Sequence, residues 1–252
     1  MDNYRNFGVP VKRKKGNVFL KVIMLLCVIV IASIAALYVR DGTAFDRLRK
    51  AVITQNEDDE EGDGFKVNWN KIKNKDVVAW IRFKSIEEIS YPIMQADDNS
   101  YYLHRNTKEQ YSFAGSIFMD YHNNSDFSDQ NTIIYGHNMA DGTMFGSLKK
   151  LMDDEFYSKH PYFYIYTRDG RMLKYQIFSA SVIQPSSSIY TYAFGDLEKY
   201  QEYIDTWVNN SMYDAGTKPS VNDRIVTLST CTQHGSKRFA VQGYLVKEKI
   251  QE

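Results

Sequence analysis

The sequence has no excess of charge of either sign and almost no cysteine. Its 252 residues contain 31 Lys and Arg against 31 Asp and Glu, so the formal net charge is zero. The chain therefore lacks the excess of positive charge that is typical of nucleic-acid-binding proteins. The two cysteines and five histidines are scattered, without the clusters of thiol, imidazole and carboxylate groups that bind metals. We therefore expect no nucleic-acid partner, no metal and no cofactor.

One segment, residues 22–39, carries neither a charge nor a proline. As a helix rising roughly 1.5 Å per residue it would extend about 27 Å, close to the thickness of the hydrocarbon layer of a membrane. A cleaved signal peptide would need a shorter apolar core followed by a small-x-small site, whereas this segment continues through Leu37, Tyr38 and Val39 into Arg40. We expect a retained, single-pass membrane anchor.

The charges around this segment predict its orientation. Six of the first 21 residues are basic and one is acidic, and four of the basic residues lie at positions 12–15. The positive-inside rule then keeps the N-terminus in the cytoplasm and exports everything after Arg40. The predicted order is a basic cytoplasmic tail (1–21), the anchor (22–39), a helix and acidic linker (40–64), a folded domain (65–249) and a short tail (250–252).

The linker combines two kinds of sequence. Residues 45–52 have the apolar spacing of a short amphipathic helix, and residues 57–64 are mostly acidic. The acidic run lacks the alternating ligands and distal Glu of a calcium-binding loop, so we expect a solvated spacer.

The folded domain is predicted to be mainly β with helical additions. Short β-branched or aromatic runs alternate with polar turns, which is typical of strands, and Asp169-Gly170 between two such runs is a strong hairpin signal. The expected strands are residues 89–94, 116–119, 131–135, 162–167, 173–183, 224–230 and 239–246, after an extended run near Val77. Asp196 is a plausible N-cap for one inserted helix of about four turns, residues 197–212. The pattern favours a closed or nearly closed β-barrel.

Cys231 is the one thiol that the anchor would export, because Cys27 lies inside the predicted span. No internal disulfide can form between them, and a lone thiol in oxidising surroundings is unusual. A buried, inert cysteine is one interpretation. The other is chemical, because Cys231 closes a predicted strand, His137 follows the end of another, and Arg238 opens the next strand seven residues later.

These three residue types suit acyl transfer through a thiol. An imidazole can take the thiol proton or, when charged, stabilise the thiolate. A guanidinium is a permanent donor for the oxyanion that forms when the thiolate attacks a peptide carbonyl, and the imidazole can then protonate the departing amine. We therefore expect Cys231 as nucleophile, His137 as proton-transfer group and Arg238 as oxyanion donor. His234 and Lys237 remain competing candidates for the imidazole and the cation.

Three strings resemble the motifs of sortases: TIIYGHN at 132–138, TLSTC at 227–231 and RFAVQG at 238–243. Within that family the runs DVVAWI (76–81), YPIMQ (91–95) and DNSYYL (98–103), with the helix before the cysteine strand, are most similar to class B. The resemblance covers roughly residues 69–246. It implies a closed sortase-type barrel of about eight strands with N-terminal helices.

The resemblance also implies a function. Sortases are membrane-bound cysteine transpeptidases of the Gram-positive cell surface that cleave a C-terminal sorting signal in a secreted protein. They join the new end to an amine of peptidoglycan, of its lipid-linked precursor, or of a pilin lysine. By resemblance to class B, the signal is of the N-P-x-T or S/P-P-x-T-G type, and residues 189–194 choose between them. The same resemblance assigns Asn99, Leu103, Tyr135 and Ser229 to the peptide groove.

Two other functions stay open. L,D-transpeptidases also use cysteine, histidine and arginine, but they carry His-Gly directly before the cysteine and an arginine two residues after it. Here Ser229 and Thr230 precede Cys231. The non-enzymatic alternative is a membrane-anchored surface binding module, for which substituting Cys231 would leave function intact.

Overall fold

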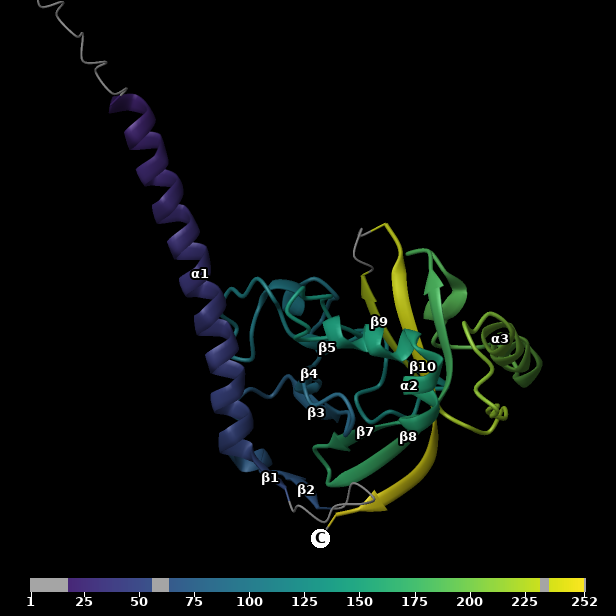
Figure 1. The fold of residues 1–252 in the computed structure, drawn as a ribbon. Coiled ribbons are helices and arrows are strands. Elements are labelled where there is room, and N and C mark those ends of the chain that lie inside the picture. Colours follow the sequence, from purple (N-terminus) through teal and green to yellow (C-terminus); the bar gives the residue numbers. More distant parts are fainter. Residues whose placement is uncertain (1–17, 56–63, 232–235, 252) are drawn as a thin grey trace, which may run out of the picture.

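The computed structural model describes residues 18–55, 64–231 and 236–251. Most of the predicted cytoplasmic tail, the acidic run at 57–63 and the competing candidate His234 lie outside the described residues. The described chain forms a β-barrel with one long N-terminal helix projecting from its side (Figure 1).

Eight strands close into a mixed barrel in the order β10-β8-β7-β3-β4-β5-β6-β9, which confirms the predicted fold. Most pairs are antiparallel, but β4 with β5 and β6 with β9 are parallel. The strands are β3 (Val77–Arg82), β4 (Ser90–Met94), β5 (Ile117–Met119), β6 (Asn131–Tyr135), β7 (Tyr162–Thr167), β8 (Arg171–Ile183), β9 (Ile225–Cys231) and β10 (Arg238–Ile250). The predicted hairpin joins β7 to β8, where Gly170 adopts a φ of 89° that favours glycine.

The barrel interior is filled by branched and aromatic side chains. Ile81, Ile165 and Leu228 are among the fully buried residues of the largest apolar cluster. β6 is buried on both of its faces apart from its last residue, because the strand also contacts groups outside the barrel. A strand buried on both faces is held in register by apolar packing as well as by its ladder hydrogen bonds.

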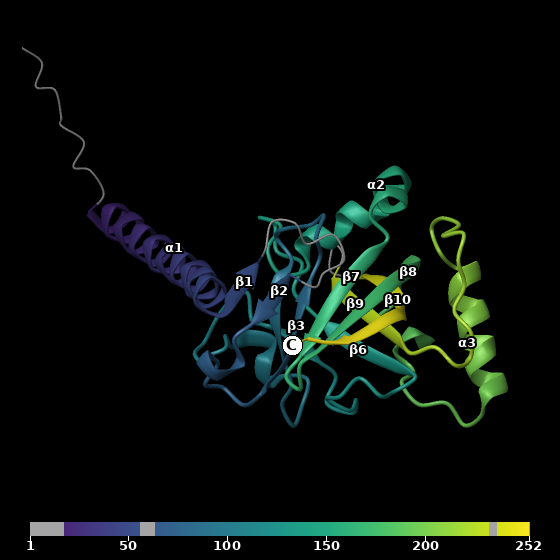
Figure 2. The same ribbon diagram turned by 90° about the horizontal axis from the view of Figure 1, so that it is seen from below.

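The inserted helix α3 (Leu197–Asn209) lies on the side of the barrel opposite the N-terminal helix (Figure 2). Asp196 caps it by accepting a hydrogen bond from the Lys199 amide at 2.8 Å, as predicted. Its buried face, Tyr200, Tyr203, Ile204 and Trp207, packs on the barrel. The predicted apolar stripe was too long, because Leu197 is 56% and Met212 50% exposed. Met212 lies beyond the end of the helix, and its amide donates a hydrogen bond to Ala180 O at 2.8 Å.

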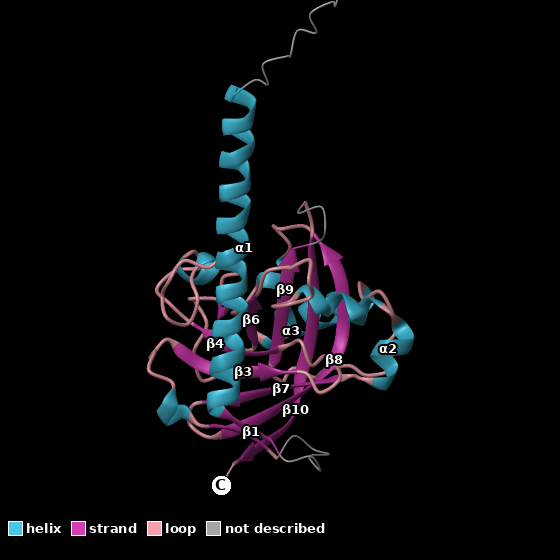
Figure 3. Ribbon diagram, turned by 60° about the vertical axis from the view of Figure 1, so that its left-hand side comes forward, coloured by secondary structure: helices cyan, strands magenta, loops and turns pink. Residues whose placement is uncertain are grey.

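The N-terminal helix α1 (Val18–Val52) is one continuous helix of 35 residues. Residues 45–52 are helical as predicted, but they continue the apolar helix instead of forming a short helix of their own. No proline or glycine pair interrupts the chain between the anchor and the amphipathic segment, so one helix can contain both. Its apolar half is long enough to cross a membrane and is not buried by the protein. Figure 3 shows its lower part running along the barrel and its upper part projecting beyond it.

Short elements complete the fold. The β1 (Ile53–Gln55) and β2 (Phe65–Val67) strands form a separate two-stranded sheet below α1, which the sequence did not predict because each strand has only three residues. The remaining elements are η1 (Trp69–Lys71), η2 (Tyr101–His104), η3 (Gly146–Met152), α2 (Asp154–Lys159) and η4 (Ser188–Tyr190).

Candidate active site

Strand register brings the three predicted catalytic positions to one edge of the barrel. In the parallel pair of β6 and β9, Tyr135 is opposite Ser229. His137 follows Tyr135 by two residues, and Cys231 follows Ser229 by two residues. In the antiparallel pair of β9 and β10, Cys231 is directly opposite Arg238. Since neighbouring strands lie about 4.8 Å apart, the backbone of Cys231 lies between the segments that carry the imidazole and the guanidinium.

A glycine sets the position of the His137 backbone. A Cβ on Gly136 would come within 2.7 Å of the Phe145 ring, so only glycine allows this approach. The Gly136 amide donates to Ser229 O at 3.1 Å, and the Phe145 amide donates to His137 O at 3.0 Å. The chain leaving β6 is therefore held to β9 on one side and to the segment before η3 on the other.

The His137 ring is half-buried and oriented by one hydrogen bond. Its Nε2–H donates to Leu103 O at 2.8 Å, and because a carbonyl can only accept, Nδ1 is the basic nitrogen of the neutral ring. Burial is the main cause that lowers the pKa of His137, the Leu103 carbonyl opposes it, and His104 lowers it further. The neutral imidazole, which can accept a proton, is thus favoured near neutral pH.

His104 is a neighbour of His137 for which the sequence indicated no role in the site. Their rings stack with centroids 5.5 Å apart and planes inclined by 27°. The sequence did hold one indication that His104 lies near the site: it directly follows Leu103, a predicted groove residue, in the short helix η2. His122 and His160 contact other aromatic rings: Tyr121 and Tyr192 for His122, Phe156 for His160.

A surface groove of about 380 Å³ runs along this edge of the barrel. It brings together all four predicted peptide-binding residues, Asn99, Leu103, Tyr135 and Ser229, with His137 and Arg238. The Arg238 guanidinium donates to Lys237 O at 3.2 Å. Five further residues line the groove and were not predicted: Phe118, Gly136, Pro185, Tyr190 and Thr230.

Tyr190 crosses the groove from η4. Its hydroxyl is 2.8 Å from Ser229 Oγ. The loop that carries it is held by buried polar groups, because Asn131 Nδ2 donates to Thr191 O at 2.8 Å and the Tyr203 hydroxyl donates to Ile189 O at 2.8 Å. The sequence had marked residues 189–194 as the variable loop but did not identify this tyrosine.

Asp120 is a buried carboxylate that contacts two of the groove residues. Its Oδ2 accepts hydrogen bonds from Asn99 Nδ2 at 2.8 Å and from the Tyr135 hydroxyl at 2.9 Å. Burial acts to raise the pKa of Asp120, but hydrogen bonds from His122, Asn99 and Tyr135 outweigh it and hold the pKa below its ordinary value. The charged carboxylate therefore orients two predicted groove residues, a role that local sequence could not indicate because the three residues are far apart in the chain.

A closed barrel whose adjacent strand ends carry histidine, cysteine and arginine is the arrangement of a cysteine transpeptidase. The sortase domain family matches residues 81–246, and the chain belongs to this family. It is 40% identical over 178 residues to Sortase B of Listeria monocytogenes, covering 69% of this chain and 71% of that protein.

Two solved structures of class B sortases are similar to this chain. The structure of sortase B from Bacillus anthracis in complex with AAEK1 has a TM-score of 0.72 and 33% identity, covering 84% of this chain and 99% of the other. A Staphylococcus aureus sortase B-substrate complex has a TM-score of 0.66 and 32% identity, covering 71% and 82%. The predicted class B membership is thereby confirmed, and the chain is a cysteine transpeptidase.

Proposed function

We propose that this sortase cleaves the C-terminal sorting signal of an exported protein through a thioester on Cys231 and transfers the acyl group to a cell-wall amine. The observation that carries the proposal is the register of β6, β9 and β10. Cys231 is opposite Arg238, and Tyr135 and Ser229, which lie two residues before His137 and Cys231, are opposite each other. Sortase relatives support a substrate with a sorting signal and an amine acceptor.

Each residue has one role in the proposed reaction. The Cys231 thiolate attacks the scissile carbonyl, and Arg238 donates hydrogen bonds to the oxyanion that forms. His137, in its imidazolium form, protonates the amine that leaves as the peptide bond breaks. The incoming amine then attacks the thioester, loses a proton to His137 and releases the thiolate.

The groove supplies the proposed contacts to the sorting signal. Leu103 and Tyr135 give it apolar and aromatic surface, while Asn99 and Ser229 give it polar groups. A signal of the N-P-x-T or S/P-P-x-T-G type has the same mixture of apolar and polar side chains. Tyr190 lines the groove, which supports a role for residues 189–194 in selecting between these signals.

The proposed topology follows from α1. Residues 22–39 span the membrane, the basic tail stays in the cytoplasm, and the barrel lies outside the cell. The apolar half of α1 is exposed in the folded chain, as expected for a helix that lipid surrounds. The acceptor amine then belongs to peptidoglycan or to its lipid-linked precursor.

The test is to incubate the full-length chain in detergent with a panel of peptides of both signal types and to weigh the protein by mass spectrometry. We expect a mass increase equal to the acyl fragment, located at Cys231, which disappears when an amine acceptor is added. Cys231→Ala is the control and should form no adduct.

Absence of an adduct with every peptide, in a chain that is folded by circular dichroism, would contradict the proposal. Surface function that survives Cys231→Ala would instead favour the non-catalytic binding module.

A further inference from the structure

Two large aromatic side chains point into solvent between η2 and β5. Tyr111 is 60% and Phe113 62% exposed, while Ser112 between them is fully buried. Tyr111 and Phe113 are therefore the outward-facing side chains on either side of Ser112. An exposed tyrosine and an exposed phenylalanine two residues apart offer apolar surface that a partner can cover.

The backbone holds this segment in place. Arg105 and Tyr111 form an antiparallel bridge, the Ser112 amide donates to His104 O at 3.0 Å, and the Gly115 amide donates to Ser112 O at 3.2 Å. Because Ser112 is anchored to the barrel side, Phe113 and Tyr111 cannot turn inward without breaking these hydrogen bonds.

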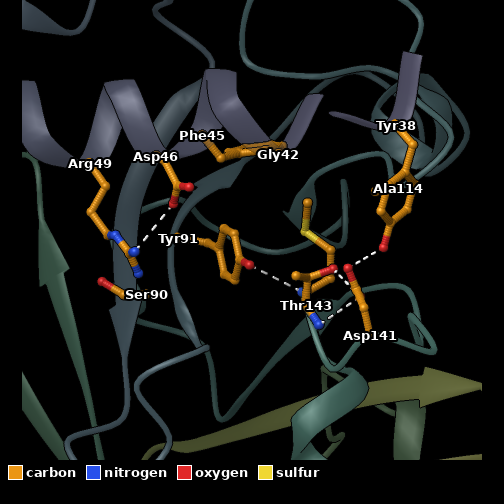
Figure 4. Close-up of a pocket in the computed structure, with 11 residues that line it drawn as sticks. Tyr38, Gly42, Phe45, Asp46, Arg49, Ser90, Tyr91, Ala114, Asp141 and Thr143 are labelled. Atoms are coloured by element: carbon orange, nitrogen blue, oxygen red, sulfur yellow. Dashed lines mark hydrogen bonds and ion pairs between the residues drawn. The ribbon is translucent and has the colours of Figure 1, made fainter. Parts of the chain in front are cut away.

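The segment lies beside the point where the apolar span of α1 ends. The guanidinium of Arg40, the first charged residue after residues 22–39, donates to Tyr111 O at 3.0 Å. Two residues earlier, the Tyr38 hydroxyl donates to Asp141 on the barrel, as Figure 4 shows. Arg40 is therefore at the depth where the span meets water, and Tyr111 is at the same depth.

The active-site edge faces the same way. β9 ends and β10 begins at the edge of the barrel that points along the projecting half of α1, as Figures 1 and 3 show. Tyr111 also connects to the site through His104. The Tyr111 ring stacks on His104 with centroids 6.3 Å apart, and His104 stacks on His137.

We propose that residues 105–115 form a membrane-contact surface whose Phe113 and Tyr111 rings enter the headgroup region of the bilayer that α1 spans. Aromatic rings are enriched at this depth because they have an apolar body, and in tyrosine a polar tip. The contact holds the barrel with its active-site groove turned toward the membrane, within reach of an amine carried by a lipid. The proposal rests on the proposed membrane anchor and not on the thioester chemistry.

The test uses the full-length chain in phosphatidylcholine nanodiscs with and without bromine on the acyl chains, since bromine quenches nearby tryptophan. The variant is Phe113→Trp, and the matched control is Leu197→Trp, an exposed apolar position on α3 across the barrel from α1. After subtraction of the parent chain's emission, we expect brominated lipid to remove most of the fluorescence added at position 113 and none of that added at 197.

Four results would overturn the proposal, three of which leave the membrane anchor in place. The first is emission at position 113 that brominated lipid leaves unchanged. The second is equal quenching at both positions, which would indicate unspecific adsorption. The third is emission at position 113 shielded from acrylamide in detergent, with shielding that rises with protein concentration, which would indicate a second copy of the chain as the partner. A chain that does not enter nanodiscs would remove the anchor and this proposal together.

A second measurement separates this proposal from the proposed function. Phe113→Ser should slow transfer onto a lipid-tethered amine severalfold and leave transfer onto a soluble amine unchanged. Quenching without any thioester would uphold the membrane contact and reject the transpeptidase mechanism. A thioester without quenching would uphold the transpeptidase mechanism and reject the membrane contact.

Discussion

Two hollows on the barrel surface differ in how their walls are built. The groove at the β6, β9 and β10 edge is lined by residues at the ends of paired strands, above a buried polar network. The smaller hollow, about 110 Å³, lies between α1 and the barrel and is lined from the helix by Tyr38, Phe45 and Arg49 (Figure 4). The first wall depends on strand register, and the second on side-chain contacts between a helix and a surface.

The interactions that stabilise the two walls should therefore contribute different amounts to the free energy of unfolding. Under the groove, Asn131 connects strands, loop and α3: its amide donates to Thr191 O and to the Tyr203 hydroxyl, and its Oδ1 accepts from Thr227 Oγ1 at 2.8 Å. In the hollow beside the helix, Phe45 and Tyr91 form an edge-to-face aromatic pair with centroids 5.6 Å apart. Positions for chemistry need the first kind of support, because a displacement of about 1 Å can remove much of the rate.

The largest predicted effect comes from a matched pair of arginine substitutions, one in each hollow. Arg238→Lys should lower kcat roughly 10²- to 10³-fold, because a lysine does not reproduce the planar donors that face the oxyanion. Arg49→Lys, whose guanidinium binds Asp46 at 3.2 Å on the surface, should leave kcat unchanged. Transpeptidation rates of the two variants check this, and equal losses would contradict the assignment of Arg238.

The second prediction concerns stability under the groove. Asn131→Ala should lower the free energy of unfolding by about 2–3 kcal/mol, because it leaves buried partners of the amide without a hydrogen bond. Asn131 is fully buried, so water cannot replace the lost amide. Chemical denaturation of the full-length chain measures the change, and a loss under about 0.5 kcal/mol would mean that the network contributes little.

The third prediction concerns the helix contact. Phe45→Ala should cost about 1 kcal/mol, the usual worth of an aromatic pair, and should loosen α1 while the barrel stays intact. Hydrogen exchange should speed up at amides of residues 41–52 and stay unchanged in β6 and β9. Faster exchange throughout the barrel would show that α1 supports the active-site edge, which would remove the contrast between the two hollows.

The smallest predicted effect concerns the His104–His137 stack. His104 contributes to the lowered pKa of His137, so His104→Gln should raise that pKa. A higher pKa means that His137 becomes protonated at higher pH, so its titration midpoint should move upward. Imidazole NMR signals measure the midpoint, with His160→Gln as the control that should leave it in place; a downward shift would contradict the repulsion.

Local sequence patterns were sufficient for the elements of the barrel. Short β-branched and aromatic runs located seven of its strands, and most strand ends were right to within one or two residues. The Asp169-Gly170 turn located the β7–β8 hairpin. They failed where an element is very short, as in β1 and β2, or where its limit depends on tertiary contacts. The end of α3 at Asn209 is such a limit, because the following chain turns away to bond β8.

The sequence by itself determined the class of fold and the apolar helix, and it predicted Cys231, His137 and Arg238 as the catalytic residues, because each of these inferences depends on residues that are close together in the chain. Only the tertiary structure decided how these groups meet: the parallel pairing of β6 with β9, the hydrogen bonds of Asp120, the stacking of His104 and the place of Tyr190. Such contacts join residues tens of positions apart, and their free energy depends on a register that only the closed barrel provides.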